Sequence, residues 1–361
     1  MKGMILAAGY GTRLWPLTID RTKPAIPVMG RPLVGYVAEY LARFGIREVL
    51  VNLHHQPDSV RDALGDGSRF GVRLRYIYEP EILGTGGALD NAREFLEDEP
   101  FVVINGKIVT DIDLHAACAT HRERGALATL VLRPNPARER FSQVLVENGL
   151  LQGFGGMPDA SDNAGRKVKA AKDETGKTAT APKATHTDVI TVPDTADRDG
   201  EQSVPLMFTG LQILQPDIFR YIPRGRFSHT TTDVYPFALS QGEIIAGHVA
   251  AGYWYELSTL SRYLATSCAL LDESGANASL SQGAYIASGA VVKHAVLWED
   301  ARIESGARVT EAIIGAGVTI KGDMSLERVA VVRAELVRGQ AKPEKAAGGY
   351  FQGDCFVVPL S

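Results

Sequence analysis

The chain has 361 residues, of which 22% are charged and 45% hydrophobic, and its formal net charge is -4. This is the composition of an ordinary soluble globular protein large enough for two domains, and nothing in its charge points to a nucleic-acid partner. No stretch approaches the roughly 18 consecutive apolar residues that predict a membrane helix. The three cysteines are far apart and lack metal-ligand spacing, which indicates reduced thiols in a cytoplasmic protein.

Apolar strands alternate with helices over about the first 135 residues. The predicted strands are MILAA, EVLVNL, LRYIY, FVVIN and LATLVL. Helices are predicted from Leu33 to Phe44, around residues 60–64, in GGALDNAREFL and in AACATHRERG. Continuous apolar strands separated by helices predict an α/β fold with a doubly wound, Rossmann-like, mostly parallel sheet. Ligands of such sheets bind beyond the carboxyl ends of the strands.

The composition changes between residues 157 and 204, which are rich in Lys, Asp, Thr, Ala and Gly and contain no Phe, Trp or Tyr. Such a stretch buries too little apolar surface to offset its ordering entropy, so a mobile insertion is predicted. A solvent-exposed loop without a functional role is favoured over a lid that covers the substrate. The fold resumes at PLMFTGLQIL, and the first domain is expected to span residues 1–264.

A different periodicity begins after a helix predicted near residues 258–272. Aliphatic residues recur every six positions within three groups: Leu280, Ile286 and Val292; Leu297, Ile303 and Val309; Ile314 and Ile320. This hexapeptide repeat predicts a left-handed β-helix, which together with its linker helix forms a second domain at 265–361. The flat faces of such a helix favour an oligomerisation or regulatory role over a separate acyltransferase activity.

The segment MILAAGYGTRLWPLTIDRTKPAIPV is the most informative of the chain. Gly9 and Gly11 follow a strand directly, so the backbone can turn sharply and direct its N–H groups at an anion. Arg13 and Lys23 add positive charge suited to a triphosphate. The segment matches neither GxxxxGK[ST] nor GxGxxG, and on these residues alone an ordinary structural turn explains the glycines equally well.

The complete string LAAGYGTRLWPLT, followed by TKP, resembles the signature of the sugar-1-phosphate nucleotidylyltransferases. The resemblance extends in order through LGDGSRFGVRLRY, EPEILGTGGALDNA, VVINGKIVTDID, FTGLQIL and YWYELSTLSRYL, most like mannose-1-phosphate guanylyltransferases and short bacterial uridylyltransferases. It implies that a sugar 1-phosphate attacks the α-phosphorus of a nucleoside triphosphate, giving an NDP-sugar and pyrophosphate. GTP with mannose 1-phosphate is the favoured pair, although the sequence fixes neither base nor sugar.

The resemblance also implies roles for particular residues. Arg13 would contact the β and γ phosphate groups, and Lys23 would lie near the α-phosphate. The triphosphate loop would comprise Ala7, Ala8, Gly9, Gly11 and Thr12, and the base and ribose would lie against Gly84, Thr85, Gly86 and Gly87. The sugar phosphate would be contacted by Asn105, Gly106, Thr209 and Gly210.

The sequence departs from the family where magnesium is expected. In the family an Asp follows the NG that ends a strand, and it binds Mg²⁺ with a second Asp in W-x-D-x-G-T. Here the first position is Lys107, and the second motif reads WYELST, with Glu256 in place of Asp. A third motif, Glu-Lys-Pro, is replaced by GGMPD. A charged lysine cannot ligate Mg²⁺.

Two interpretations of Lys107 stand. In the first, its ammonium is a third catalytic cation beside Arg13 and Lys23, and Glu256, Asp111 or Asp113 holds a displaced Mg²⁺. In the second, Lys107 pairs with Glu256 and fills the site, and the protein is a non-catalytic, nucleotide-sugar-binding regulatory homologue. The intact Arg13, Lys23 and LGTGG favour a working cytoplasmic enzyme that forms homo-oligomers through its β-helix and has no membrane or nucleic-acid partner.

Overall fold

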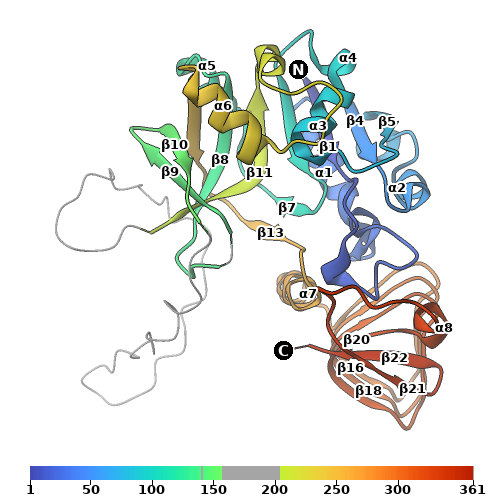
Figure 1. Cartoon of the computed structure of the whole chain (residues 1–361). Coiled ribbons are helices and arrows are strands. Elements are labelled where there is room, and N and C mark those ends of the chain that lie inside the picture. The colour runs from blue at the N-terminus through green and yellow to red at the C-terminus, as the bar shows by residue number, and fades with distance from the viewer. Residues whose placement is uncertain (140, 157–203, 361) are drawn as a thin grey trace, which may run out of the picture.

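The computed structural model describes residues 1–139, 141–156 and 204–360. The predicted insertion therefore lies outside the described residues, except for Val204. The N-terminal part of the chain forms a large sheet with helices on both faces, and the C-terminal part forms a separate stack of short strands beside it (Figure 1). No helix among the described residues is long and apolar enough to cross a membrane.

The large sheet has nine strands in the order β5-β4-β1-β6-β11-β8-β12-β10-β9. Their bounds are β1 Lys2–Leu6, β4 Glu48–Leu53, β5 Arg73–Tyr78, β6 Phe101–Asn105, β8 Ala128–Pro134, β9 Gln143–Glu147, β10 Leu150–Phe154, β11 Leu206–Leu214 and β12 Ile245–Val249. Strands β5, β4, β1 and β6 are parallel neighbours, and β12 is parallel to β8. However, β11 runs antiparallel between β6 and β8, and β10 is antiparallel to both β12 and β9. The sheet is thus mixed, and its parallel half matches the prediction.

Helices cover both faces of the sheet, as a doubly wound fold requires. They are α1 Leu33–Arg43, α2 Pro57–Leu64, α3 Gly84–Asn91, α4 Arg93–Leu96, α5 Leu114–Glu123 and α6 Tyr235–Ser240. Alternate residues of one strand enter two different cores: Ile5 of β1 packs with α1, α2 and α5, whereas Met4 packs with α3, α4 and α6. Asp113 caps α5 by accepting a hydrogen bond from the His115 amide at 2.8 Å, so its role there is structural.

The C-terminal stack follows α7 Leu260–Ser274. Its strands are β14 Ala278–Leu280, β15 Tyr285–Ile286, β16 Val291–Leu297, β17 Arg302–Ile303, β18 Arg308–Ile314, β19 Thr319–Ile320 and β20 Ser325–Arg333, followed by α8 Ala334–Val337, β21 Tyr350–Gln352 and β22 Cys355–Pro359. Equivalent residues of successive coils pair in parallel: Leu280 with Leu297 and Ile314, and Ile286 with Ile303 and Ile320. The aliphatic positions that defined the repeat are the rungs of the stack.

A third apolar core joins the two parts of the molecule. It combines residues of the glycine-turn segment (residues 4–28) and the start of α1 with residues of the C-terminal part, including Leu14, Trp15, Ile26 and Leu33 on one side and Trp298, Ile313, Val332 and Phe356 on the other. The repeat domain therefore packs directly against the segment that carries Lys23, a contact that the periodicity of the sequence did not indicate.

Candidate functional site

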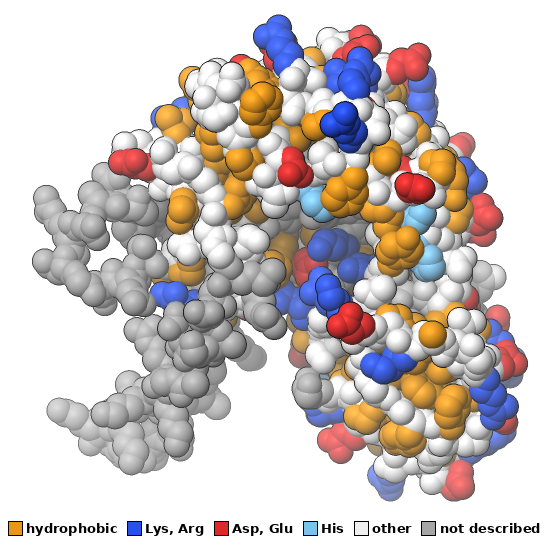
Figure 2. All heavy atoms as spheres, in the orientation of Figure 1, with side chains coloured by type: hydrophobic (Ala, Val, Ile, Leu, Met, Phe, Trp, Pro, Cys, Tyr) orange, Lys and Arg blue, Asp and Glu red, His pale blue; other side chains and the backbone are white. Residues whose placement is uncertain are grey.

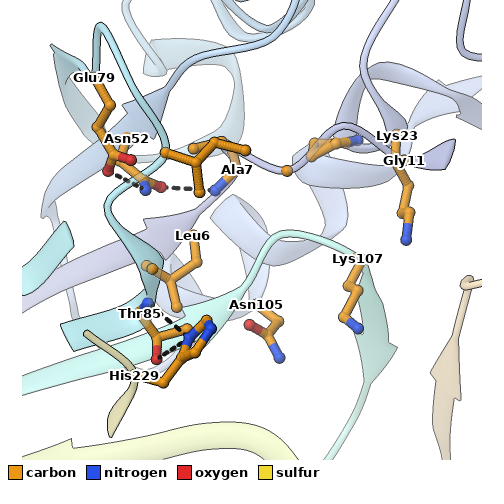
Figure 3. A pocket seen from close by; sticks show the side chains of 15 residues that line it. Leu6, Ala7, Gly11, Lys23, Asn52, Glu79, Thr85, Asn105, Lys107 and His229 are labelled. Carbon is orange, nitrogen blue, oxygen red and sulfur yellow. Dashed lines mark hydrogen bonds between the residues drawn. The ribbon is translucent and has the colours of Figure 1, made fainter. Parts of the chain in front are cut away.

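A cavity of about 270 Å³ lies at the carboxyl ends of β1, β4 and β6 (Figure 3). Its wall is formed by Leu6, Ala7, Ala8, Gly9, Gly11, Lys23, Pro24, Asn52, Glu79, Ile82, Gly84, Thr85, Asn105, Lys107 and His229. The cavity brings together the glycine turn, the LGTGG segment and the NGK segment, which are distant in the sequence. In the space-filling view, Lys and Arg side chains gather in the hollow between the two parts of the molecule (Figure 2).

The glycine turn is held by its carbonyl groups, which leaves its amides free. The Gly9 carbonyl accepts a hydrogen bond from the Thr22 hydroxyl and the Gly11 carbonyl accepts one from Thr18, both at 3.2 Å. Because a trans peptide points its N–H opposite its C=O, the amides that follow these carbonyls face away from the 18–22 segment. Within the described part of the chain, the Gly9, Tyr10 and Gly11 amides donate no hydrogen bond. Such a row of unbonded amides is suited to an anion.

Asn52 and Glu79 form a buried support that the sequence analysis missed. Asn52 accepts a hydrogen bond from the Ala7 amide at 2.7 Å and donates one to Glu79 Oε1, also at 2.7 Å. Glu79 Oε2 in turn accepts from the Leu83 amide at 3.2 Å. These bonds tie the ends of β1, β4 and β5 together along one side of the cavity (Figure 3). The available signal was a polar residue near the end of each strand: Asn52 is the penultimate residue of EVLVNL, and Glu79 directly follows RLRYIY.

The glycines that begin α3 serve close packing. A Cβ at Gly84 would lie 2.4 Å from the Ser228 carbonyl oxygen, and a Cβ at Gly87 would lie 2.6 Å from that of Arg226. The Gly86 amide donates to the Ser228 carbonyl at 2.8 Å, so it is not available to an anion. Gly84 and Thr85 do line the cavity, whereas Gly86 and Gly87 do not.

His229 was also missed, and it belongs to the wall beside Thr85. The Thr85 amide donates to His229 Nδ1 at 3.3 Å, and the Thr230 amide donates to the Thr85 hydroxyl at 2.9 Å. These bonds join the start of α3 to the 228–230 segment. Sequence reasoning had no signal for His229, since it precedes a run of threonines outside any recognised motif.

At the end of β6, only the asparagine of the predicted sugar-phosphate group lines the cavity. The Gly106 amide donates to the Leu6 carbonyl at 2.9 Å, which holds β6 against β1. Thr209 is buried and donates its hydroxyl to the Val131 carbonyl at 2.8 Å, so its side chain faces β8 instead of the cavity. Gly210 has φ +84°, and a Cβ there would lie 2.0 Å from the amide nitrogen of Asn105. Gly210 therefore makes room for the Asn105 side chain.

Lys107 forms an ion pair with Glu256. The Lys107 Nζ lies 2.6 Å from Glu256 Oε1, and Glu256, which is only 3% exposed, also has Arg262 Nε 3.7 Å from its Oε2. The pair exists because β7 Ile108–Thr110 and β13 Trp254–Glu256 are antiparallel, with Glu256 opposite Ile108. Burial alone raises the pKa of Glu256, but Lys107, together with Ser258 and Lys23, more than offsets this, so the pKa lies below its usual value.

Lys23 and Lys107 lie on the same side of the cavity, away from Asn52 and Glu79 (Figure 3). Burial and the nearby positive charge of Lys107 lower the pKa of Lys23 to about 7. No hydrogen bond or ion pair to the Lys23 ammonium exists among the described residues. Arg13 does not line this cavity. It lines a second one of about 320 Å³, between the start of α7 and residues 344–347.

The residues of this site do not fit a divalent metal ion. The described part of the chain contains no cluster of three His, Cys, Asp or Glu side chains that could hold one. Glu256 Oε1 is already occupied by the Lys107 ammonium, and Asp111 accepts a hydrogen bond from the Tyr253 amide at 2.6 Å, beyond the other end of the β7–β13 pairing. Glu256 and Asp111, the two predicted ligands, are therefore not brought together, while Mg²⁺ requires several oxygen ligands.

The glycine turn at the tip of β1 thus lies beside the Lys23 and Lys107 side chains in one cavity. The chain belongs to the nucleotidyl transferase family, whose pattern matches residues 2–273. Residues 260–341 match the GlmU-like C-terminal hexapeptide family. The overlap of the two matches falls on α7, which links the two parts of the structure.

Relatives of known activity are similar to this chain over different numbers of residues. Mannose-1-phosphate guanylyltransferase of Mycobacterium tuberculosis is 28% identical over 344 residues, which cover 91% of this chain and 83% of that protein. UTP--glucose-1-phosphate uridylyltransferase of Synechocystis sp. is 28% identical over 256 residues, 67% of this chain but only 56% of that protein. The crystal structure of HddC from Yersinia pseudotuberculosis complexed with GMP-PN has a TM-score of 0.55 and 20% identity, covering 75% of this chain and 99% of that one. This last likeness concerns the fold.

Proposed function

We propose that the protein transfers a nucleoside monophosphate from a nucleoside triphosphate to a sugar 1-phosphate, releasing pyrophosphate. GTP and mannose 1-phosphate are the pair to test first, since the mannose-1-phosphate guanylyltransferase relative spans most of the chain. One observation carries the proposal: unbonded amides of the glycine turn and the ammonium groups of Lys23 and Lys107 line one cavity.

In this proposal a phosphate oxygen of the sugar 1-phosphate forms a bond to the α-phosphorus while the bond from that phosphorus to the β-bridging oxygen breaks. Pyrophosphate leaves with the electron pair. Both reactants are anions, so the contribution of the protein is positioning and charge neutralisation. The glycine turn, Lys23 and Lys107 hold the triphosphate, Asn105 receives the sugar phosphate, and Arg13 contacts the far phosphate groups from the neighbouring cavity. Thr85 and His229 stand where the nucleoside would lie.

The test is pyrophosphate release by the purified chain with a panel of triphosphates and sugar 1-phosphates, with and without divalent metal. The expected result is release with at least one pair, and Arg13→Ala and Lys23→Ala each lower turnover by orders of magnitude. Arg328→Ala is a suitable control, because that side chain pairs with Glu311 on the exposed surface of the repeats. No release with any pair, or unchanged rates in both loop variants, contradicts the proposal.

A second candidate function is non-catalytic binding of a nucleotide or nucleotide-sugar by a regulatory homologue. The Lys107–Glu256 ion pair favours it, because this pair occupies the position of the family's metal site. This candidate expects binding without turnover and a gain of activity in Lys107→Asp. Turnover by the unaltered chain decides against it.

We also propose that the repeats wind as a left-handed β-helix, that this domain mediates homo-oligomer formation, and that the protein acts in the cytoplasm. The parallel rungs and the hexapeptide match support the first point. Light scattering of the purified chain at several concentrations tests the second, and a monomer throughout contradicts it.

A further inference from the structure

The charges around the Lys107–Glu256 pair leave a local excess of positive charge. Arg262, whose Nη1 lies 2.5 Å from Glu139 Oε2, is balanced by that carboxylate. Glu256 is balanced by Lys107. Lys23 forms no ion pair with a described carboxylate; burial and Lys107 lower its pKa, and Glu256, already paired with Lys107, offsets this only in part. Glu79, the acidic residue on the cavity wall, is bonded to Asn52 on the other side. A divalent cation at this position would meet the Lys107 ammonium and, below about pH 7, the Lys23 ammonium as well.

The same side chains retain several hydrogen-bond donors. An ammonium has three N–H donors, and Glu256 Oε1 accepts from only one of those on Lys107. The Lys107 side chain is 31% exposed and reaches the cavity, and the Lys23 ammonium has no described partner. Together with the amides of the glycine turn, these donors face a space large enough for part of a nucleotide. The ligand that completes such a set carries several closely spaced anionic oxygens.

We propose that this site binds the polyphosphate of its nucleotide free of divalent metal, with Lys107 and Lys23 supplying the charge that a metal ion would otherwise supply. Glu256 acts as a positioning residue, because it holds the Lys107 ammonium at the end of β6 through their 2.6 Å contact. This inference rests on the proposed function, since it assumes that a nucleotide occupies the cavity, and it applies equally to the catalytic and the non-catalytic candidate.

The experiment measures the dissociation constants of GTP, UTP and inorganic tripolyphosphate for the full chain by calorimetry, in EDTA and in saturating Mg²⁺. The affinity in EDTA is expected to equal or exceed that in Mg²⁺, because complexed Mg²⁺ removes negative charge from the ligand. If no probe binds under either condition, both the proposed function and this inference fail. If a nucleotide binds only with Mg²⁺, the proposed function stands and this inference alone is overturned.

Variants identify the groups responsible. Lys107→Met is expected to weaken tripolyphosphate binding in EDTA by at least about tenfold, as loss of a charged hydrogen bond does. Since this variant leaves the buried Glu256 without its close partner, the double variant Lys107→Met/Glu256→Met removes both charges together and should show the same loss in a stable fold. Lys321→Met removes an ammonium paired with Glu304 on the repeats and should change nothing. Unchanged binding by the double variant overturns the inference.

A second readout does not depend on phosphate. Electron paramagnetic resonance of Mn²⁺ titrated into the nucleotide-free chain is expected to show no ion bound at this site. Lys107→Asp places two carboxylates side by side and should gain Mn²⁺ binding that Glu256→Gln then removes. Mn²⁺ binding by the unaltered chain that is lost in Glu256→Gln would overturn the inference.

Discussion

Arg21 in the glycine-turn segment donates a hydrogen bond from Nη1 to Glu299 of the repeat domain at 2.9 Å, and its guanidinium stacks on Trp298 at 4.7 Å. Trp298 is itself fixed, because its Nε1 donates to the Tyr263 hydroxyl at 2.9 Å. Arg21 lies just before Lys23 in the chain. The repeat domain thus holds the backbone that presents Lys23 to the cavity.

Glu299→Gln is expected to weaken nucleotide binding two- to fivefold, since a partly exposed ion pair contributes about 0.2–1 kcal/mol. Arg21→Met, which also loses the stacking on Trp298, should weaken it further, and Arg21→Lys should restore part of the affinity. Calorimetry of the full chain measures these effects. Arg328→Met is the matched control, because it breaks an ion pair that lies within the repeats. Equal affinities in all four variants would show that the contact does not position Lys23.

The pKa of Lys23, about 7, gives nucleotide binding a distinctive pH dependence. Above pH 7 the unliganded lysine loses its proton, so binding must restore it, and the affinity should fall by up to about tenfold per pH unit. Lys23→Arg should flatten this profile, because a guanidinium stays charged. The dissociation constant measured from pH 6 to 9 checks the prediction, and a profile that Lys23→Arg does not alter contradicts it.

Lys23 should also make folding stability depend on pH, but stability should rise with pH where nucleotide affinity falls. The unfolded chain keeps the lysine proton up to about pH 10.5, whereas the folded chain releases it near pH 7. Because the unfolded state then binds more protons, this group raises the free energy of unfolding as the pH increases between these values. Urea unfolding of the unaltered chain and of Lys23→Met at pH 6.5 and 8.5 should show this rise only in the former.

Breaking the Lys107–Glu256 pair from one side should destabilise the fold strongly. Lys107→Met leaves the buried carboxylate without its close partner, with Arg262 Nε 3.7 Å from Oε2, at an expected cost of up to about 3–5 kcal/mol. Lys107→Met/Glu256→Met should recover most of this, since replacement of both charges by apolar groups is often close to neutral. Urea unfolding measures the three proteins. A single variant as stable as the parent would mean that the carboxylate remains solvated or paired elsewhere.

Gly84→Ala should destabilise the protein by about 1–3 kcal/mol, because φ is +72° there and the new Cβ would lie 2.4 Å from the Ser228 carbonyl oxygen. Nucleotide affinity should also fall, since Thr85 and His229 on the cavity wall move with this contact. Gly348→Ala is the control: a Cβ there meets nothing within 4 Å. Thermal unfolding and calorimetry of both variants check the prediction, and equal results for the two would refute it.

Sequence reasoning anticipated the elements whose signal is local. The apolar strands, the hexapeptide rungs and the glycine turn all follow from spacing along the chain, so their positions were predictable. The antiparallel direction of β11 between β6 and β8 was not predictable. It depends on how the chain re-enters the sheet after residues 157–203, and a run of apolar residues indicates a strand without indicating its direction. The position of Lys107 was evident from its motif, and its contact with Glu256 was one of two open alternatives.

What the sequence could not supply were contacts between distant segments. Asn52 and Glu79 each look like an isolated polar residue at a strand end, and only the sheet order places them in contact. Gly86 and Gly87 resemble ligand-binding glycines in the sequence, but their neighbours at residues 226–228 show that they serve packing. Likewise, the periodicity of the repeats describes their own stacking and says nothing about the segment on which they rest.

The last strands of the repeat domain pair differently from the parallel strands of the preceding coils. β22 pairs antiparallel with β20, and β21 pairs antiparallel with β22. A coil from another molecule approaching this end would meet a hairpin whose hydrogen-bonding pattern differs from that of a parallel rung. The hairpin therefore ends the parallel stack, because the last hydrogen-bonding edge of this sheet belongs to an antiparallel strand instead of a coil.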